Sequence, residues 1–167
     1  MKNEKAERRR EKKMTKTTII KKEYKIEYGA DLRYADLRDA DLRYADLRTA
    51  NLSYANLTCA DLTDTDLTDA DLEDTILTDA ILRYADLSYA NLKDANFHGA
   101  DLSGANLRVA DLSNANLSNA DLRDARVTGA NLRDADLRGI KYDSDTKYNV
   151  GSILDLYIKN LESKVDE

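Results

Sequence analysis

Acidic side chains crowd the middle of this 167-residue chain, where a metal site or carboxylate chemistry would first be sought. Residues 61–80 contain eight acids and no base, namely Asp61, Asp64, Asp66, Asp69, Asp71, Glu73, Asp74 and Asp79, and we call these eight the acidic band. A Ca²⁺ site needs about six to eight oxygens that converge on one point. Because the band has neither an EF-hand loop nor a glycine-rich nonapeptide pattern, the sequence predicts a solvated surface and no metal site.

Nucleophilic catalysis finds equally little support in the residue types. His98 is the single histidine and Cys59 the single cysteine, and no base flanks Cys59 in the sequence. Neither a Ser-His-Asp nor a Cys-His arrangement is evident from the spacing. We therefore expect a protein that is not an enzyme and that uses no cofactor. A lone cysteine cannot form an internal disulfide, which fits a reducing compartment.

Composition and charge narrow the class of protein further. Charged residues make up 35% of the chain, against about 25% in an average domain, and the net charge is -6. No stretch approaches the roughly 20 apolar residues that a membrane span requires, and the basic N-terminus lacks the apolar core of a signal peptide. These features favour a cytoplasmic location without membrane contact. Residues 1–29 are basic, 30–139 acidic and 140–167 mildly acidic, which predicts boundaries near 29 and 140.

The elements that position the acids are set by a period of five residues. From Ala30 to Gly139 there are 22 consecutive units with Ala first in 20, Asp or Asn second in 19, and Leu third in 20. The exceptions are Thr65 and Thr75 at the first position, Ile76, Ile81 and Arg126 at the second, and Phe97 and Val127 at the third. Repeats of this kind predict a solenoid in which each coil buries its apolar face against its neighbours.

A period of five fits neither a regular helix nor a flat strand. On a helix, positions five apart scatter around the axis, and in a strand they fall on opposite faces. The first and third positions are two apart, however, and share a side. A chain that runs extended for about three residues and turns a corner every five therefore places both Ala and Leu inside.

The Ala-Asp/Asn-Leu-x-x pattern resembles that of the pentapeptide repeat proteins over 110 of the 167 residues. The resemblance implies an all-β solenoid, a right-handed quadrilateral β-helix with four units per coil and therefore about 5.5 coils. We expect Phe97 to be a local packing adjustment and the hydroxyls of Thr65 and Thr75 to bond to backbone. Truncating the inward Leu87 should be costly, whereas Ser88→Ala beside it should be nearly silent.

Both ends of such a β-helix need covering, because their backbone edges and core are otherwise exposed. Residues 1–16 are predicted to be a charged arm, either helical or disordered, and residues 17–29 to be a capping strand or loop. Residues 140–167 are predicted to hold a C-terminal helix that starts after Ser152, with Asp155 as its capping partner. Its apolar face either covers the last coil or also docks a second copy to form a homodimer, and it consists of Leu154, Tyr157, Ile158, Leu161 and Val165.

Residues 20 apart should stack on one face, which places outward side chains in columns. Tyr34 should stack on Tyr54, and Asp64 should lie between Tyr44 and Tyr84. The candidate partner surface combines most of the acidic band with two apolar residues, and it comprises Asp64, Asp66, Asp69, Asp71, Glu73, Asp74, Asp79, Ile76 and Ile81.

Two functions remain open at this point. The first is a non-enzymatic structural or protein-binding module, with a protein as partner and no direct nucleic-acid binding by the repeat body. The alternative, implied by the resemblance, is a DNA mimic that inhibits or protects a type II topoisomerase such as gyrase. The Leu-rich core and the arginines scattered among the acids on all four faces depart from that second type, so the module is the leading hypothesis.

Overall fold

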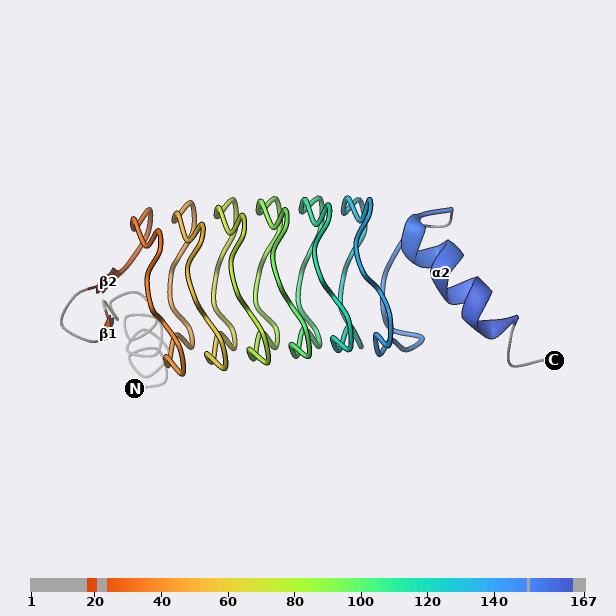
Figure 1. The fold of residues 1–167 in the computed structure, drawn as a ribbon, viewed down its shortest axis with the longest axis horizontal. Coiled ribbons are helices and arrows are strands. Elements are labelled where there is room, and N and C mark those ends of the chain that lie inside the picture. Colours follow the sequence, from red (N-terminus) through yellow and green to blue (C-terminus); the bar gives the residue numbers. More distant parts are fainter. Residues whose placement is uncertain (1–17, 21–23, 150, 164–167) are drawn as a thin grey trace, which may run out of the picture.

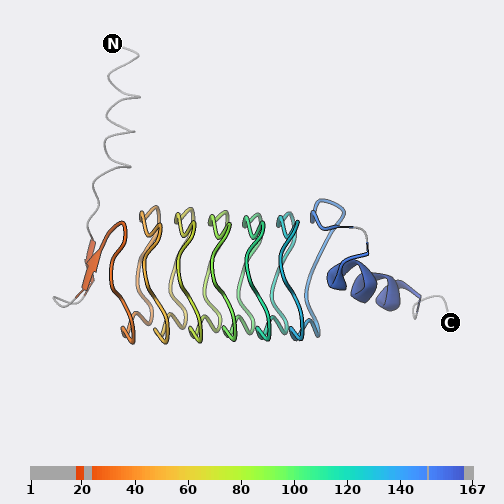
Figure 2. The same cartoon turned by 90° about the horizontal axis from the view of Figure 1, so that it is seen from above.

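The structure is a computed structural model that describes residues 18–20, 24–149 and 151–163. Two short antiparallel strands, β1 (Thr18–Ile20) and β2 (Tyr24–Ile26), lie at one end of a four-sided rod, and a helix, α2 (Ile153–Glu162), lies at the other. The rod itself is a stack of coils that follow the chain from one end to the other (Figures 1 and 2). The predicted arm of residues 1–16 lies outside the described residues.

Each five-residue unit contributes one short bridge and one turn. The second residue pairs in parallel with the second residue 20 positions later, as in Asp31 with Asn51, and this pairing recurs on all four sides. Leu32 N–H donates to Asn51 O at 2.7 Å, while Ala35 N–H donates back to Leu32 O at 3.1 Å and closes the corner. Every coil is thus tied to the next by backbone hydrogen bonds at a spacing of 20 residues.

The corners require a backbone conformation that most residues avoid. The fifth residue of the unit has a positive φ, for example 61° at Tyr34 and 56° at Asp64, in the manner of the third residue of a type II turn. This left-handed region suits Gly, Asn and Asp but costs other residues free energy. The ladder offsets that cost, since the N–H of Tyr34 donates to Ser53 O on the next coil at 3.1 Å.

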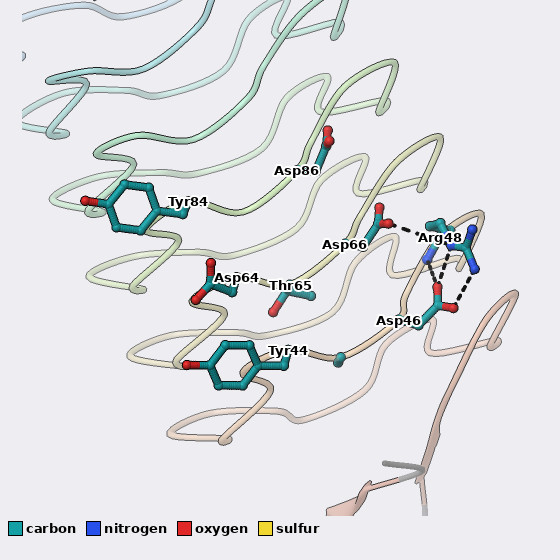
Figure 3. A pocket seen from close by; sticks show the side chains of 9 residues that line it. Tyr44, Asp46, Arg48, Asp64, Thr65, Asp66, Tyr84 and Asp86 are labelled. Atoms are coloured by element: carbon teal, nitrogen blue, oxygen red, sulfur yellow. Dashed lines mark hydrogen bonds and ion pairs between the residues drawn. The ribbon is translucent and has the colours of Figure 1, made fainter. Parts of the chain in front are cut away.

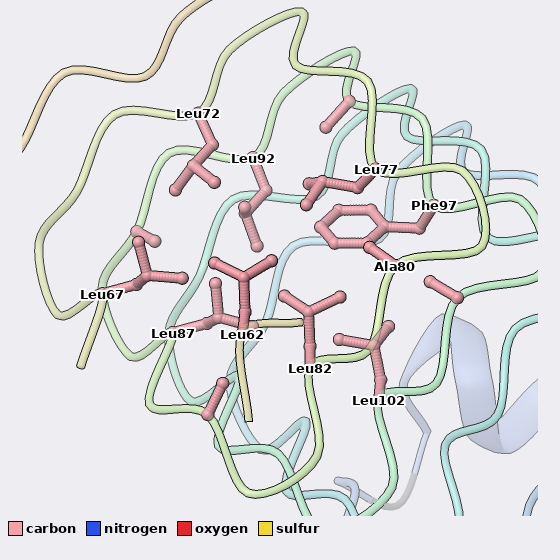
Figure 4. Close-up of a cluster of buried hydrophobic side chains, with 14 of the residues drawn as sticks. Leu62, Leu67, Leu72, Leu77, Ala80, Leu82, Leu87, Leu92, Phe97 and Leu102 are labelled. Atoms are coloured by element: carbon pink, nitrogen blue, oxygen red, sulfur yellow. The ribbon is translucent and has the colours of Figure 1, made fainter. Parts of the chain in front are cut away.

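The interior is packed with the Leu and Ala side chains of the third and first positions (Figure 4). Leu62, Leu82 and Leu102 succeed one another along one side, and Phe97 is as fully buried as they are. The two threonines at the first position are also buried. Thr65 Oγ1 donates to Leu42 O at 2.8 Å and Thr75 Oγ1 to Leu52 O at 2.9 Å, which confirms the expected backbone bonds.

Some side chains at the fourth position of the unit contribute to the fold, although they were expected to vary without affecting it. Ser88 is only 7% exposed, and its hydroxyl donates to Asp86 Oδ1 at 2.6 Å. The reason is that the second residue bends its side chain over the turn and accepts bonds from the residue two places on. This bond predicts a measurable cost for Ser88→Ala, in place of the nearly silent effect expected from the sequence.

The N-terminal end of the rod is covered by the segment that contains β2. Ile26 is 1% exposed and belongs to the core, while Tyr24 packs against it. The Tyr24 hydroxyl accepts from Asp36 N–H at 3.4 Å, and Gly29 N–H donates to Arg48 O at 2.9 Å. This segment thereby joins the first coil of the ladder.

At the C-terminal end the ladder continues past the last regular unit. Arg126 pairs with Lys147, 21 positions away, so one extra residue is accommodated in the final turn. Thr146 is buried there, and its hydroxyl donates to Leu122 O on the preceding coil at 3.0 Å. Thr65 and Thr75 form the same kind of bond to the coil before them. One irregular corner, between Lys141 and Lys147, thus extends the β-helix before α2 begins.

Candidate interaction surface

Four residues of the acidic band occupy the four corners of one coil. Asp64, Asp69, Asp74 and Asp79 stand at successive fifth positions with φ between 54° and 57°, and all are exposed. Because each corner points in a different direction, their carboxylates cannot converge. Within the described part of the chain, no group of three or more His, Cys, Asp or Glu side chains could hold a metal ion.

The remaining acids of the band lie on the flat sides of the rod, and each contacts another side chain of the same protein. Asp71 accepts from Asn91 Nδ2 at 3.0 Å, one coil further on. Glu73 forms an ion pair with Lys93 at 3.1 Å. Asp66 accepts from Thr68 Oγ1 at 2.6 Å. These bonds run either within a unit or straight up a column, so the band is a set of separate local arrangements and forms no single site.

Ile76 and Ile81 break a local rule of the repeat. In all but one of the other units the second residue is Asp or Asn, and its side chain can accept the N–H of the residue two places on, as Asn56 does from Thr58 at 3.0 Å. An isoleucine cannot accept that bond, and Ile76 and Ile81 are 40% and 38% exposed. They flank the corner at Asp79. The chain therefore gives up two local hydrogen bonds and gains two exposed apolar side chains.

A groove runs along one edge of the rod and brings together residues from three successive coils (Figure 3). We call it the Tyr–Asp groove. One wall is the column Tyr44, Asp64 and Tyr84, and the other is the column Asp46, Asp66 and Asp86 with Arg48. Ala45 and Thr65 form its floor, and its volume is about 380 Å³.

The charges in the groove are neutralised at one end only. Arg48 Nη2 lies 2.6 Å from Asp46 Oδ2, which lowers the pKa of Asp46, and Arg48 Nε lies 3.8 Å from Asp66. Asp86 accepts from Ser88 and from Asn106 Nδ2, which are neutral. The Asp64 carboxylate has no hydrogen-bond or ion-pair partner among the residues that the structure describes. The groove thus has four carboxylates against one guanidinium.

The sequence predicts only some of the residues that line this groove. Asp64 and Asp66 belong to the predicted partner surface, whereas Asp46 and Asp86 do not, although they lie 20 residues before and after Asp66. The 20-residue spacing is the signal that could have found them. The same spacing correctly predicts the Tyr34–Tyr54 stack, whose ring centroids lie 5.1 Å apart with planes at 12°.

His98 also has a neighbour one coil away. Its Nδ1 lies 2.8 Å from Ser118 Oγ, a pair that local sequence motifs do not reveal. The Ser118 hydroxyl donates its proton to Asn116 Oδ1 at 2.6 Å, so toward His98 it acts as an acceptor. A catalytic serine needs the opposite arrangement, in which the imidazole accepts the hydroxyl proton. The His98–Ser118 contact is therefore a surface hydrogen bond that does not activate the serine as a nucleophile.

The C-terminal helix has its apolar face turned toward the rod. Leu154 is fully buried and Ile158 is 2% exposed, and both belong to the core cluster, while Tyr157 packs partly against it. Leu161 is half-buried, and Val165 lies outside the described residues. The helix starts as expected, because Ser152 Oγ accepts from Asp155 N–H at 3.2 Å. Leu154 and Ile158 thus serve the cap.

The outward side of α2 carries two exposed apolar side chains. Ile153 and Leu156 are the exposed apolar side chains of α2, at 44% and 61% exposure. Asp155 is turned inward, where it accepts from Gly151 N–H and pairs with Lys159 at 2.8 Å. The dimer through the apolar face of this helix therefore stays a prediction.

The four-sided coil with a repeat of five defines this chain as a β-solenoid of pentapeptide units. A family model described as pentapeptide repeats matches residues 30–69, 60–99 and 100–139. The chain belongs to the pentapeptide repeat family, whose members form right-handed quadrilateral β-helices. Among curated proteins, none matches the chain significantly.

Several solved structures are similar to it. The pentapeptide repeat protein Rfr23 from the cyanobacterium Cyanothece 51142 is 43% identical over 58% of this chain and 66% of its own, with a TM-score of 0.57. HetL, involved in heterocyst differentiation regulation in Nostoc sp. strain PCC 7120, is 39% identical over 68% and 60%, with a TM-score of 0.45. The chain therefore spans less than two thirds of the length of either protein. QnrB1, a plasmid-mediated fluoroquinolone resistance protein, is 21% identical over 77% and 71%, with a TM-score of 0.41.

Proposed function

We propose that this protein is a non-enzymatic protein-binding module of the cytoplasm. Members of its family are generally structural or binding proteins. In the described part of the chain no helix is long and apolar enough to cross a membrane. The β-helix acts as a rigid display on which the inward positions hold the fold and the outward positions vary. The proposed partner surface is the coil of residues 61–81, with its acids and its two exposed isoleucines.

The observation that carries the proposal is the pair Ile76 and Ile81. At both positions Asp or Asn would complete a turn, and the neighbouring units show that this arrangement is available, as Asn96 accepts from His98 N–H at 3.1 Å. Exposed apolar side chains that replace a satisfied polar group weaken the local fold. Exposed apolar side chains beside charged ones are typical of surfaces that bind proteins.

The experiment is an affinity capture from a native cell extract with the full chain and two variants. Proteins retained by the wild type should be lost with Ile76→Asn combined with Ile81→Asn, since these changes remove the apolar contacts but keep the repeat consensus. Val109→Asn is the matched control, because Val109 is 50% exposed and lies on another column. If the double variant captures the same proteins as Val109→Asn, the coil of residues 61–81 is not the interface.

The acids of this surface are tested in the same experiment. Replacing Asp64, Asp69, Asp74 and Asp79 by Asn removes four charges at corners where Asn is well accommodated, as at Asn114 and Asn119 with φ of 59° and 60°. The captured partner should bind more weakly, and the difference should shrink at high salt. Equal capture at low salt would exclude the corner acids from the interface.

The alternative function is a DNA mimic directed at a type II topoisomerase. A mimic needs a continuous row of unpaired acids, since duplex DNA carries one charge per about 1.7 Å. Here many second-position acids are paired within their own units, as Asp36 is with Arg38 and Asp136 with Arg138. That pairing favours the binding module. A gyrase supercoiling assay with purified protein is the direct test, and inhibition at micromolar protein would establish the alternative instead.

A further inference from the structure

The two tyrosines of the Tyr–Asp groove stand apart with a carboxylate between them. Tyr44 and Tyr84 are 53% and 55% exposed and lie two coils apart, a separation of about 9.6 Å at a strand spacing of about 4.8 Å. Tyr84 leans over Gly104, where any Cβ would collide with its ring. The absence of a side chain at Gly104 makes room for the Tyr84 ring there. The ring therefore does not fill the groove beside Asp64 (Figure 3).

The opposite wall repeats one residue type but changes its partner. Asp46 is paired with Arg48 two residues on, whereas the residues two places after Asp66 and Asp86 are Thr68 and Ser88. Beyond the reach of Arg48 the wall is therefore anionic without a guanidinium of its own. Together with the unpaired Asp64 it favours a cationic ligand.

The chain itself shows how such a ligand would be held. Arg48 places two nitrogens 2.6 and 2.8 Å from the carboxylate oxygens of Asp46, and its guanidinium carbon lies 5.5 Å from the ring centroid of Tyr28. Arg83 repeats the arrangement more loosely, with its guanidinium carbon 5.8 Å from the ring centroid of Tyr84 and its Nε 3.9 Å from Asp101. A carboxylate and a tyrosine ring thus hold a guanidinium closely at Arg48 and loosely at Arg83 on this surface.

From the exposed rings, the unpaired carboxylate and this internal example, we infer that the Tyr–Asp groove binds an arginine side chain of a partner protein. The guanidinium pairs with Asp64 and either Asp66 or Asp86, and it stacks against the ring of Tyr44 or Tyr84. Arginine fits better than lysine, because a planar guanidinium binds a carboxylate through two parallel bonds and stacks on an aromatic ring. The inference rests on the proposed protein-binding function and names the chemistry of the partner.

The test is a titration of the ¹⁵N-labelled full chain with a capped Gly-Arg-Gly-Arg-Gly peptide, followed by backbone amide NMR. Shifts should concentrate at residues 44–46, 64–66 and 84–86. The same peptide with lysine should bind more weakly, and the peptide with uncharged citrulline should not bind. Equal shifts for arginine and lysine, or shifts spread over other faces, would leave only general attraction between opposite charges and would overturn the inference.

Variants at the groove separate binding from folding. Tyr44→Asn and Asp64→Asn place Asn at corners of the type that Asn114 and Asn119 occupy, so the fold should be kept. Each variant should lower the affinity for the arginine peptide by about fivefold or more. Tyr89→Asn is the control, because Tyr89 is 58% exposed at another corner outside the groove. Unchanged affinity in both groove variants would contradict the inference.

Two further outcomes are distinguishable. Substituting Gln for Arg8, Arg9 and Arg10 in the full chain tests whether the protein's own basic segment is the occupant. Groove amides that shift in that variant without peptide would overturn the assignment to a partner. If the peptide fails to bind while the capture through Ile76 and Ile81 succeeds, the arginine site is wrong and the binding module stands.

Discussion

The interior and the exterior of this β-helix use the same five-residue unit with very different tolerance. Inside, the third position is Leu in 20 of 22 units, and those side chains are fully or almost fully buried. Outside, the second position accepts Asp, Asn, Ile or Arg, and the fifth accepts Tyr, Asp, Asn, Gly, Thr, Cys or Val. The backbone bonds between coils make no use of these outward side chains. The fold therefore depends strongly on the inward side chains and much less on the outward positions that are available for binding.

The largest expected effect comes from the interior. Leu87→Ala should lower the free energy of unfolding by about 2–5 kcal/mol, because Leu87 is fully buried and the narrow core cannot close around a cavity. Ser88→Ala should cost about 1 kcal/mol through loss of the bond to Asp86. Urea unfolding of both variants measures the two values. Equal losses would mean that the inward and outward assignments are mistaken.

A smaller effect is expected for a polar group inside the core. Thr75→Val keeps the shape of the side chain but removes the hydroxyl that donates to Leu52 O, which should cost about 1 kcal/mol. Leu52 O keeps its bond from Ala55 N–H at 2.9 Å, so the loss stays moderate. The control is Thr78→Val at an outward position, where a change within about 0.5 kcal/mol is expected. A larger loss at Thr78 than at Thr75 would reverse the interpretation.

An outward change should stabilise the fold while it weakens binding. Ile76→Asn supplies the missing acceptor for Thr78 N–H, in a column that already has Asn56 and Asn96, and should raise the free energy of unfolding by about 0.5–1 kcal/mol. The reverse change, Asn56→Ile, should lower it by a similar amount. Urea midpoints measured beside partner capture would reveal the opposite signs. A loss of stability in Ile76→Asn would mean that Ile76 serves the fold.

How far the sequence predicts this molecule follows from the same contrast between interior and exterior. The period of five with Ala and Leu two apart predicts a chain that turns a corner every five residues, and the resemblance to pentapeptide repeat proteins supplies the four units per coil. The Tyr34–Tyr54 stack then follows from the spacing of 20. The groove is only partly predictable. Asp46 and Asp86 belong to it through stacking of distant units, and the lean of Tyr84 over Gly104 depends on local packing that the pattern does not encode.

The partners of polar side chains on the outer surface are harder still to predict. Ser88 and Ser103 occupy the same position of the unit, and both donate to the aspartate two places before, yet only Ser88 is buried. The His98–Ser118 bond likewise depends on which rotamers meet between coils. The residue type at inward positions is set by the volume of the core. The contacts of outward side chains are set by neighbours 20 residues away on the next coil.

The smallest effect concerns the exposed ion pairs and their pH dependence. Arg138 binds Asp136 through two nitrogens and lowers the pKa of Asp136 to about 2, below its usual 3.8. A folded-state pKa below the unfolded value gives stability that is present above about pH 4 and is lost as the pH falls toward 2. Since the pair is exposed to solvent, Arg138→Gln should lower the free energy of unfolding only slightly at pH 6. That difference should shrink markedly at pH 2 and also in 1 M salt, whereas the Leu87→Ala loss should persist under both conditions. Urea unfolding at the two pH values measures it, and a loss at Arg138 that rivals Leu87→Ala would show that outward side chains do support the fold.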